Sequence, residues 1–112
     1  MKVKISTSPF GTVARTSVLL ALSLLDESYP RELSRLLDLP LSGVQRALRS
    51  LESDGVIAAR SAGRTRLFRL DPRYFARVEL AALLVRLSEA EDGLRQRVEE
   101  LRRRPRRTGK PL

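Results

Sequence analysis

Apolar residues recur at helical spacing in three successive segments of the chain. Between residues 12 and 25, apolar side chains return every three or four positions with extra leucines beside them, which is typical of a deeply buried helix. Narrower apolar faces mark residues 30–37 and 41–53, and each segment ends at residues that stop helices, Asp38-Leu39-Pro40 and Asp54-Gly55. The pattern therefore predicts three helices, of which the second and third are joined by a short turn.

The spacing changes to a strand-like pattern after the third helix. Residues 56–60 and 64–70 are two β-prone runs, and Ser61-Ala62-Gly63 joins them with a glycine where a hairpin turn needs positive φ. A short extended segment is expected near Tyr29, before the second helix. The sequence thus predicts a mainly α fold with a small β-hairpin.

A long helical run is expected to follow the hairpin. Asp71-Pro72 combines a capping residue with a first-turn proline, and the helical pattern after it extends to about Arg104, with Gly93 as its weakest position. Within this run, apolar residues alternate four and three positions apart, as in the seam of a coiled coil, with one interruption at Glu91. The seam comprises Leu80, Leu84, Leu87, Leu94, Val98 and Leu101.

The seam predicts how the chain assembles. A folded domain already buries the apolar faces of its own helices, so a further exposed stripe would be a liability unless a second copy covered it. We therefore expect a homodimer whose interface is formed by the six seam residues. Two other arrangements fit the same pattern: two helices hinged near Gly93, and a seam that packs back on the first helix of the same chain.

The composition narrows the chemistry that the chain can perform. Cysteine and histidine are both absent, which removes disulfides, thiolate and imidazole metal ligands, and most nucleophiles and general bases. Apolar runs fall short of the roughly 18 residues needed to span a bilayer, and the N-terminal residues lack the apolar core of a signal peptide. We therefore expect a cytoplasmic protein without membrane attachment, enzymatic activity, cofactor or bound metal.

The charge is strongly positive. The 112 residues include 22 Lys plus Arg against 13 Asp plus Glu, a formal net charge of +9, which suggests a polyanionic partner. Six of the basic residues lie in residues 102–112, a tail without acidic residues. Because it combines like charge with proline and glycine, this tail is expected to be disordered until it meets a partner.

The order of the elements and two stretches of sequence resemble a known family. YPRELSRLLDLPLSGVQRALRSLESDGVI, residues 29–57, resembles the helix-turn-helix of ArsR- and MarR-like prokaryotic transcription regulators, and ARSAGRTRLFRL, residues 59–70, resembles their wing. The resemblance covers residues 10–75. It is closest to winged-helix domains that precede a nucleotidyltransferase domain, although no nucleotidyltransferase motif is present here.

The resemblance implies a winged helix-turn-helix with a long C-terminal helix, in a chain that regulates transcription as a repressor. Together with the apolar seam and the charge pattern, it divides the chain into an N-terminal arm (1–11), a DNA-binding domain (12–75), a dimerisation helix (76–101) and a basic tail (102–112). Metal-sensing members of the ArsR-like group bind metals chiefly through Cys and His. Because both are missing here, we do not expect a soft-metal sensor.

The predicted third helix and the hairpin carry residues suited to DNA. A helix fits the major groove, where glutamine pairs with adenine and arginine with guanine, and hairpin arginines can follow phosphates or enter the minor groove. The candidate contacts are Ser42, Gln45, Arg46 and Arg49 on the helix and Arg60, Arg64 and Arg66 on the hairpin. We expect sequence-specific binding to double-stranded DNA. The alternatives are a winged-helix module that binds protein, and RNA binding through the arginine-rich tail.

Overall fold

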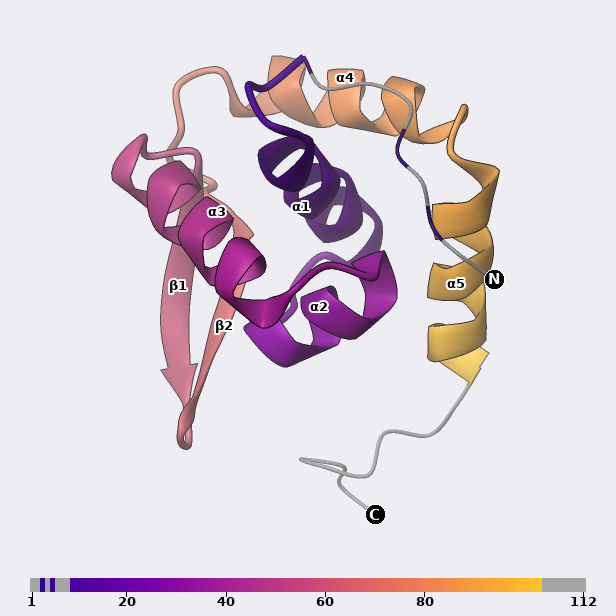
Figure 1. Ribbon diagram of the computed structural model, residues 1–112. Coiled ribbons are helices and arrows are strands. Elements are labelled where there is room, and N and C mark those ends of the chain that lie inside the picture. The colour runs from indigo at the N-terminus through magenta and orange to yellow at the C-terminus, as the bar shows by residue number, and fades with distance from the viewer. Residues whose placement is uncertain (1–2, 4, 6–8, 104–112) are drawn as a thin grey trace.

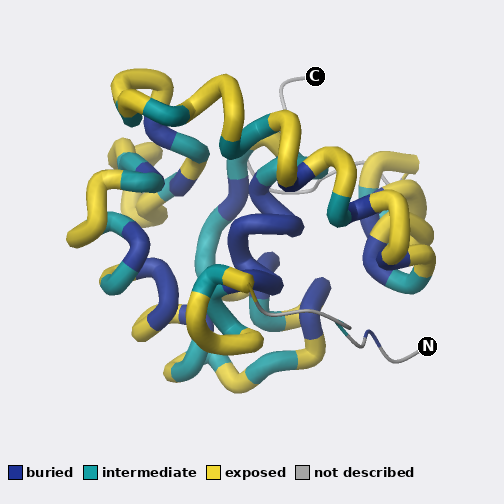
Figure 2. The backbone as a smooth tube through the Cα atoms, turned by 90° about the horizontal axis from the view of Figure 1, so that it is seen from above, coloured by how far each residue is buried: buried dark blue, intermediate teal, exposed yellow. Residues whose placement is uncertain are grey.

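Helix α1 (Val13–Leu25) lies at the centre of the molecule, with the other helices arranged around it (Figure 1). The computed structural model describes residues 3, 5 and 9–103. Thr12 caps α1, since its side-chain oxygen accepts a hydrogen bond from the Arg15 amide at 3.0 Å. Every residue from 16 to 22 is buried, because neighbouring elements cover α1 on all sides (Figure 2).

Helices α2 (Pro30–Leu37) and α3 (Leu41–Ser53) have the bounds predicted from the sequence. Asp38 makes the turn between them by adopting the left-handed conformation, with φ 56° and ψ 41°, which aspartate tolerates better than most residues. Gly55 follows α3 with a φ of +79°, as expected of a glycine that ends a helix. The apolar faces of both helices join the core through Leu33, Leu36, Leu37, Val44, Ala47, Leu48 and Leu51.

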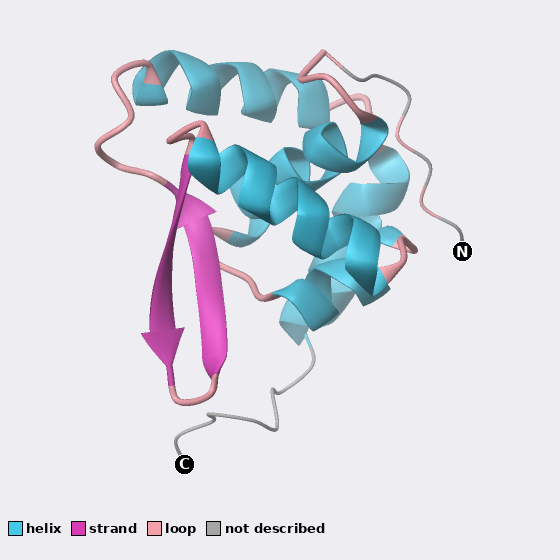
Figure 3. Ribbon diagram, turned by 60° about the vertical axis from the view of Figure 1, so that its left-hand side comes forward, coloured by secondary structure: helices cyan, strands magenta, loops and turns pink. Residues whose placement is uncertain are grey.

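Strands β1 (Ile57–Ala62) and β2 (Thr65–Leu70) form an antiparallel hairpin that projects from the helices (Figure 3). The tip is a turn at residues 63–64, so β1 continues two residues beyond the predicted run. Ser28 pairs with the outer edge of β2: its amide donates to the Phe68 carbonyl at 3.0 Å, and its carbonyl accepts from the Phe68 amide at 2.7 Å. The extended segment expected near Tyr29 is therefore present as a single bridge.

Helix α4 (Arg77–Ser88) starts later than the sequence predicts. The sequence predicts a helix cap at Asp71, but the Asp71 carboxylate accepts the Arg73 amide at 2.9 Å and its carbonyl accepts the Tyr74 amide at 3.1 Å. These local bonds give the backbone an alternative to the helix, so the segment before α4 forms turns.

The C-terminal helical run is divided into two helices. Helix α5 (Asp92–Arg103) follows α4 after a turn at residues 89–91, and the break lies just before Gly93. Both helices pack on α1 (Figure 1). In the described part of the chain, none of the helices has the length and apolar character that crossing a membrane requires.

The leucine seam expected to join two copies is used within the chain. Leu84, Leu94 and Val98 are 0%, 1% and 3% exposed, and they belong to the same core as α1. The other seam residues are half-buried: Leu80, Leu87 and Leu101. Because the chain turns at residues 89–91, both helices can direct these side chains toward α1. Leu84, Leu94 and Val98 are therefore contacts within one chain, with Leu80 and Leu87 packed beside them, which corrects the expectation that these residues pair with a second copy.

Candidate nucleic-acid interface

Helix α3 presents a polar face to solvent and an apolar face to the core. The four contact residues predicted on this helix are all exposed: Ser42, Gln45, Arg46 and Arg49. On the opposite side, Val44 and Leu51 are 0% exposed, and their burial fixes the rotation of the helix about its own axis. The two faces of α3 are therefore those that the sequence predicts.

Arg15 at the start of α1 contacts the C-terminal end of α3. Its guanidinium donates to the Ser50 hydroxyl, pairs with Asp54 at 3.0 Å, and donates through Nε to the Phe10 carbonyl at 2.8 Å. A cation also interacts favourably with the negative end of the α3 dipole. Arg15 therefore positions α3 relative to the central helix. This role is missed from the sequence, because Arg15 and Ser50 are 35 residues apart.

Three arginines on α3 and the hairpin keep their charge available to a ligand. Arg46 and Arg49 lie on the exposed face of α3, and Arg64 lies in the turn at the hairpin tip. Within the described residues, none of these three side chains makes a hydrogen bond or an ion pair. Unpaired guanidinium groups of this kind attract the phosphates of nucleic acids.

Arg66 connects the hairpin to α3. Its Nη2 lies 2.9 Å from Oε2 of Glu52, which is one turn beyond Arg49 on α3, and its guanidinium stacks over the Phe68 ring at 5.1 Å. The Arg66 side chain is still 55% exposed. The structure thus brings Arg66 close to the exposed face of α3, but with a carboxylate beside it that a phosphate would have to compete with.

Arg60 points to the other face of the hairpin. Directly paired residues share a face, and because Arg60 pairs with Leu67 while Arg66 pairs with Ser61, the two arginines lie on opposite faces. Arg60 binds Glu27 through two hydrogen bonds of 2.8 and 2.9 Å. The Arg60 hydrogen bond lowers the pKa of Glu27, and Glu27 in turn raises the pKa of Arg60. The structure therefore separates Arg60 from the other candidate contacts.

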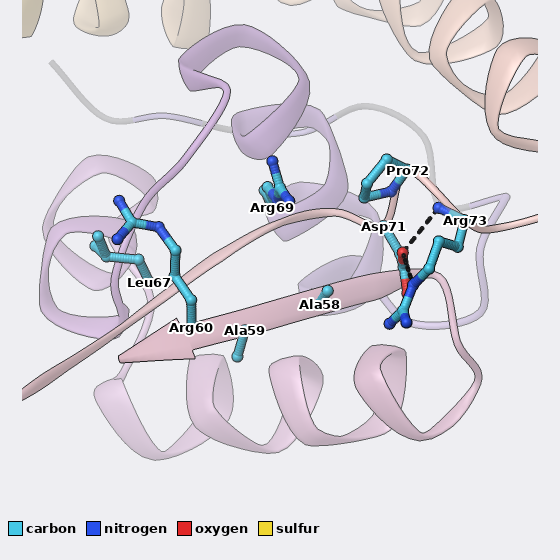
Figure 4. A pocket seen from close by; sticks show the side chains of 8 residues that line it. All are labelled: Ala58, Ala59, Arg60, Leu67, Arg69, Asp71, Pro72 and Arg73. Atoms are coloured by element: carbon cyan, nitrogen blue, oxygen red, sulfur yellow. Dashed lines mark hydrogen bonds and ion pairs between the residues drawn. The ribbon is translucent and has the colours of Figure 1, made fainter. Parts of the chain in front are cut away.

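The face that carries Arg60 borders an open cavity of about 260 Å³ (Figure 4). Its lining residues are Ala58, Ala59, Arg60, Leu67, Arg69, Asp71, Pro72 and Arg73. Nε of Arg73 lies 3.4 Å from Asp71, and the hydrogen bond from the Arg73 amide lowers the pKa of Asp71. Two of the three lining arginines are thus paired with carboxylates of the same chain. Among the described residues, no three acidic, cysteine or histidine side chains come together as a metal site would require.

Helix α2 adds two exposed arginines that are not among the contacts predicted from the sequence. Arg31 and Arg35 lie four residues apart and are therefore on one face of α2. Both are exposed, whereas Leu33, Leu36 and Leu37 of the same helix are in the core. The pair could have been found from its spacing, because the first helix of a helix-turn-helix crosses the DNA backbone.

Comparison with known proteins places the fold. No protein-family model matches the sequence, and no curated protein matches it. Among solved structures, a cysteine-to-serine mutant of Lactococcus lactis ZitR in complex with DNA is similar, with a TM-score of 0.60 and 19% identity over 88% of this chain and 66% of that chain. The fold is a winged helix. A MarR family transcription regulator is also similar to this winged helix, with a TM-score of 0.55 and 22% identity over 82% of this chain and 66% of that chain.

In this winged helix, α2 and α3 form the helix-turn-helix and β1 and β2 form the wing. A second structure of the same ZitR mutant is similar over 90% of this chain and 69% of that chain, with a TM-score of 0.57 and 18% identity. The chain spans about two thirds of the length of the two proteins compared above. At these identities the likeness concerns the fold alone.

Proposed function

We propose that this chain is a transcription regulator that binds double-stranded DNA in a sequence-specific manner. The observation that carries the proposal is the pair of exposed and unpaired arginines, Arg46 and Arg49, on the outer face of a helix whose opposite face is fully buried. The similarity to a winged helix solved in complex with DNA supports it. The wing, tied to the same helix through Arg66 and Glu52, extends the basic surface.

Helix α3 reads base pairs in the major groove under this proposal. Arg46 and Arg49 are separated by about 4.5 Å along the helix axis, which is comparable with the spacing of about 3.4 Å between successive base pairs. Each can donate two hydrogen bonds to a guanine, and Gln45 can pair with an adenine. Arg64 at the wing tip contacts a phosphate or the minor groove, and contributes affinity without base preference.

We further propose that the chain acts as a dimer and as a repressor. A two-fold dimer places two recognition helices at half-sites about one turn of DNA apart, which multiplies both the affinity and the length of the sequence that is read. Repression needs only that the bound dimer occupies promoter DNA.

Alanine variants of the recognition helix test the DNA-binding proposal. A preferred site is first selected from a random duplex pool, and binding to that site and to random DNA is then measured. Arg46→Ala and Arg49→Ala should each weaken binding to the preferred site by about 1–3 kcal/mol, and weaken binding to random DNA much less. Arg95→Ala is the matched control, because it removes the same charge from an exposed position on α5.

Three outcomes would contradict the proposal. Selection could return no preferred site, the recognition-helix variants could lose equal affinity on both DNAs, or the control could lose as much as they do. Competition with duplex RNA in the same assay addresses the alternative that the chain is an RNA-binding protein. If duplex RNA displaced the preferred DNA at equal concentration, the proposed specificity for DNA would be wrong.

A further inference from the structure

Helix α4 exposes an apolar stripe on the side that faces away from α1. Val78 is 65% exposed, Val85 is 53% exposed, and Phe75, just before the helix, is 92% exposed. Ala82, also exposed, lies between the two valines. Val78, Ala82 and Val85 are separated by four and three positions, so they share one face of the helix, and Phe75 lies in the turn that precedes it. On a soluble protein, a contiguous patch of large exposed apolar side chains often marks an interaction surface.

The inner face of α4 is apolar as well, which makes this helix unusual for a surface element. Leu84 is completely buried against the core, and Leu80 and Leu87 are half-buried beside it. A helix that lies on the surface of a single domain needs only one apolar face. The second apolar face of α4 therefore has no partner among the described residues of the same chain.

The charges beside the stripe match a second copy of the same helix. Glu79 and Arg86 are both exposed, have opposite charges, and lie seven residues apart along one edge of the stripe. Arg86 pairs with Glu89 at the end of the same helix at 2.5 Å, and because the Arg86 side chain is 82% exposed, this weak surface pair can be exchanged for Glu79 of a second copy. If two α4 helices pair antiparallel about the midpoint between Ala82 and Leu83, Glu79 of each copy lies opposite Arg86 of the other. A two-fold contact uses the same patch on both partners, so a patch that complements itself in this way favours a second copy over an unrelated protein.

We propose that the outer face of α4, formed by Phe75, Val78, Ala82 and Val85, binds the same face of a second copy in an antiparallel two-fold pair. This proposal rests on the proposed function, because the second copy is the partner that a DNA-binding dimer requires. α4 lies at the end of the molecule opposite the hairpin tip (Figure 1), so the contact leaves the wing unobstructed. A contact made largely by one pair of short helices is near the lower size limit for specific interfaces, so we expect a reversible dimer at micromolar concentration.

Sedimentation of the full chain without DNA tests this interface. The wild type should be a dimer at micromolar concentration, and Val78→Glu/Val85→Glu should raise the dissociation constant at least about 100-fold, because it places four carboxylates in the apolar contact. Val13→Glu is the matched control, since Val13 is a valine of similar exposure (51%) that lies on α1. Circular dichroism should show the same helix content in all three proteins, because the substituted side chains are exposed.

Charge reversal tests the antiparallel register. Glu79→Arg and Arg86→Glu should each weaken the dimer, and the combination Glu79→Arg/Arg86→Glu should recover most of the loss. The interface proposal is overturned if the wild type is monomeric, if Val78→Glu/Val85→Glu leaves the dimer intact, or if the combined reversal recovers nothing.

Binding to a half-site duplex separates this proposal from the proposed function. The Val78→Glu/Val85→Glu variant should bind a single half-site with wild-type affinity, while losing the extra affinity of the wild type for a site with two halves. A dimer that ignores DNA would refute the proposed function and leave the interface standing. A monomer that selects a DNA sequence would do the opposite.

Discussion

Asp38 connects three parts of the chain at the scale of a single residue. Its carboxylate accepts the Val3 amide at 3.1 Å and pairs with Nη2 of Arg97 at 3.1 Å. The same arginine donates to the carbonyls of Arg35 and Leu36 at 3.0 and 3.2 Å. These carbonyls belong to the last turn of α2, where the helix itself supplies no donor. One aspartate and one arginine thus complete the end of α2 and attach α5 to the turn of the helix-turn-helix.

The Asp38 carboxylate should make folding stability depend on pH. The hydrogen bond from the Val3 amide lowers the pKa of Asp38 below its usual value, and Arg97 lowers it further. The folded state therefore binds this proton less readily than the unfolded state. The resulting stabilisation is complete above the ordinary pKa of 3.8 and is lost as the pH falls through the lowered folded value. In urea denaturation, wild type should be more stable than Asp38→Asn at about pH 6, and the difference should shrink toward about pH 3.

Asp26→Asn is the matched control for this experiment. Asp26 also has positive φ, 71°, and like Asp38 it directly follows the last residue of a helix. Its carboxylate makes no hydrogen bond or ion pair with a described residue. If the free energy of unfolding of Asp38→Asn differed from that of wild type by the same amount at both pH values, the stabilisation by the contact with Val3 and Arg97 would not be electrostatic in origin.

At the scale of the element, the sequence predicted those helices whose ends are marked by residues with strong backbone preferences. Asp38-Leu39-Pro40 and Asp54-Gly55 determine the ends of α2 and α3 locally, and both bounds are confirmed. Asp71 is ambiguous, because the same carboxylate can cap a helix or close a turn, and in the structure it closes a turn. The break at residues 89–91 agrees with one arrangement that the sequence left open, two helices hinged near Gly93. The sequence alone could not select it, since the choice depends on where α1 offers apolar surface.

The candidate site, like the helices, could be predicted from the sequence where local patterns determine it. The exposed face of α3 follows from its apolar period, so its four candidate residues lie where the sequence places them. The hairpin face of each arginine depends on strand register, and a change of one residue reverses every side chain. The pairing of Arg60 with Glu27, 33 residues away, has no local sign in the sequence.

The carboxylate of Glu52 should limit DNA affinity in wild type. Glu52 lies between the recognition helix and the wing, paired with Arg66. Glu52→Gln removes a negative charge from the proposed DNA-binding surface and releases a guanidinium for phosphates. We expect binding to tighten about two- to fivefold, in keeping with the energy of an exposed ion pair. Fluorescence anisotropy with a labelled duplex at fixed salt measures this, with Glu100→Gln on α5 as the control. Weaker binding by Glu52→Gln would instead mean that the ion pair is needed to position the wing.

On the scale of the whole molecule, the two proposed contact surfaces lie apart from each other. The hairpin tip and α4 are at opposite ends, and α1 between them packs against both α3 and α4 (Figure 1). Further basic residues follow α5 in the sequence. Arg102 and Arg103, the first two residues of the tail that the sequence predicts to be disordered, belong to α5, which corrects that part of the prediction. Residues 104–112 of the tail lie outside the described residues.

Truncation after Arg103 should separate general attraction to DNA from sequence preference. It removes Arg104, Arg106, Arg107 and Lys110, and leaves the recognition helix and wing unchanged. Each phosphate contact adds about 0.9 to the slope of log affinity against log salt concentration, so the truncated chain should bind more weakly with a shallower slope. The ratio of affinities for preferred and random DNA should stay the same. Loss of that ratio would assign the sequence preference to the tail.

The contacts of α5 also determine the order in which the fold can be completed. Arg97 reaches residues 59 to 62 positions earlier in the chain, and Arg102 donates to the Leu24 carbonyl, 78 positions earlier. Contacts over such separations form late, because closing a long loop costs entropy before it gains any interaction. During synthesis, α1 and α2 therefore leave the ribosome with open C-terminal ends and without Leu94 and Val98 over their apolar sides. When α5 packs, it supplies donors to both helix ends and covers both apolar sides in one step.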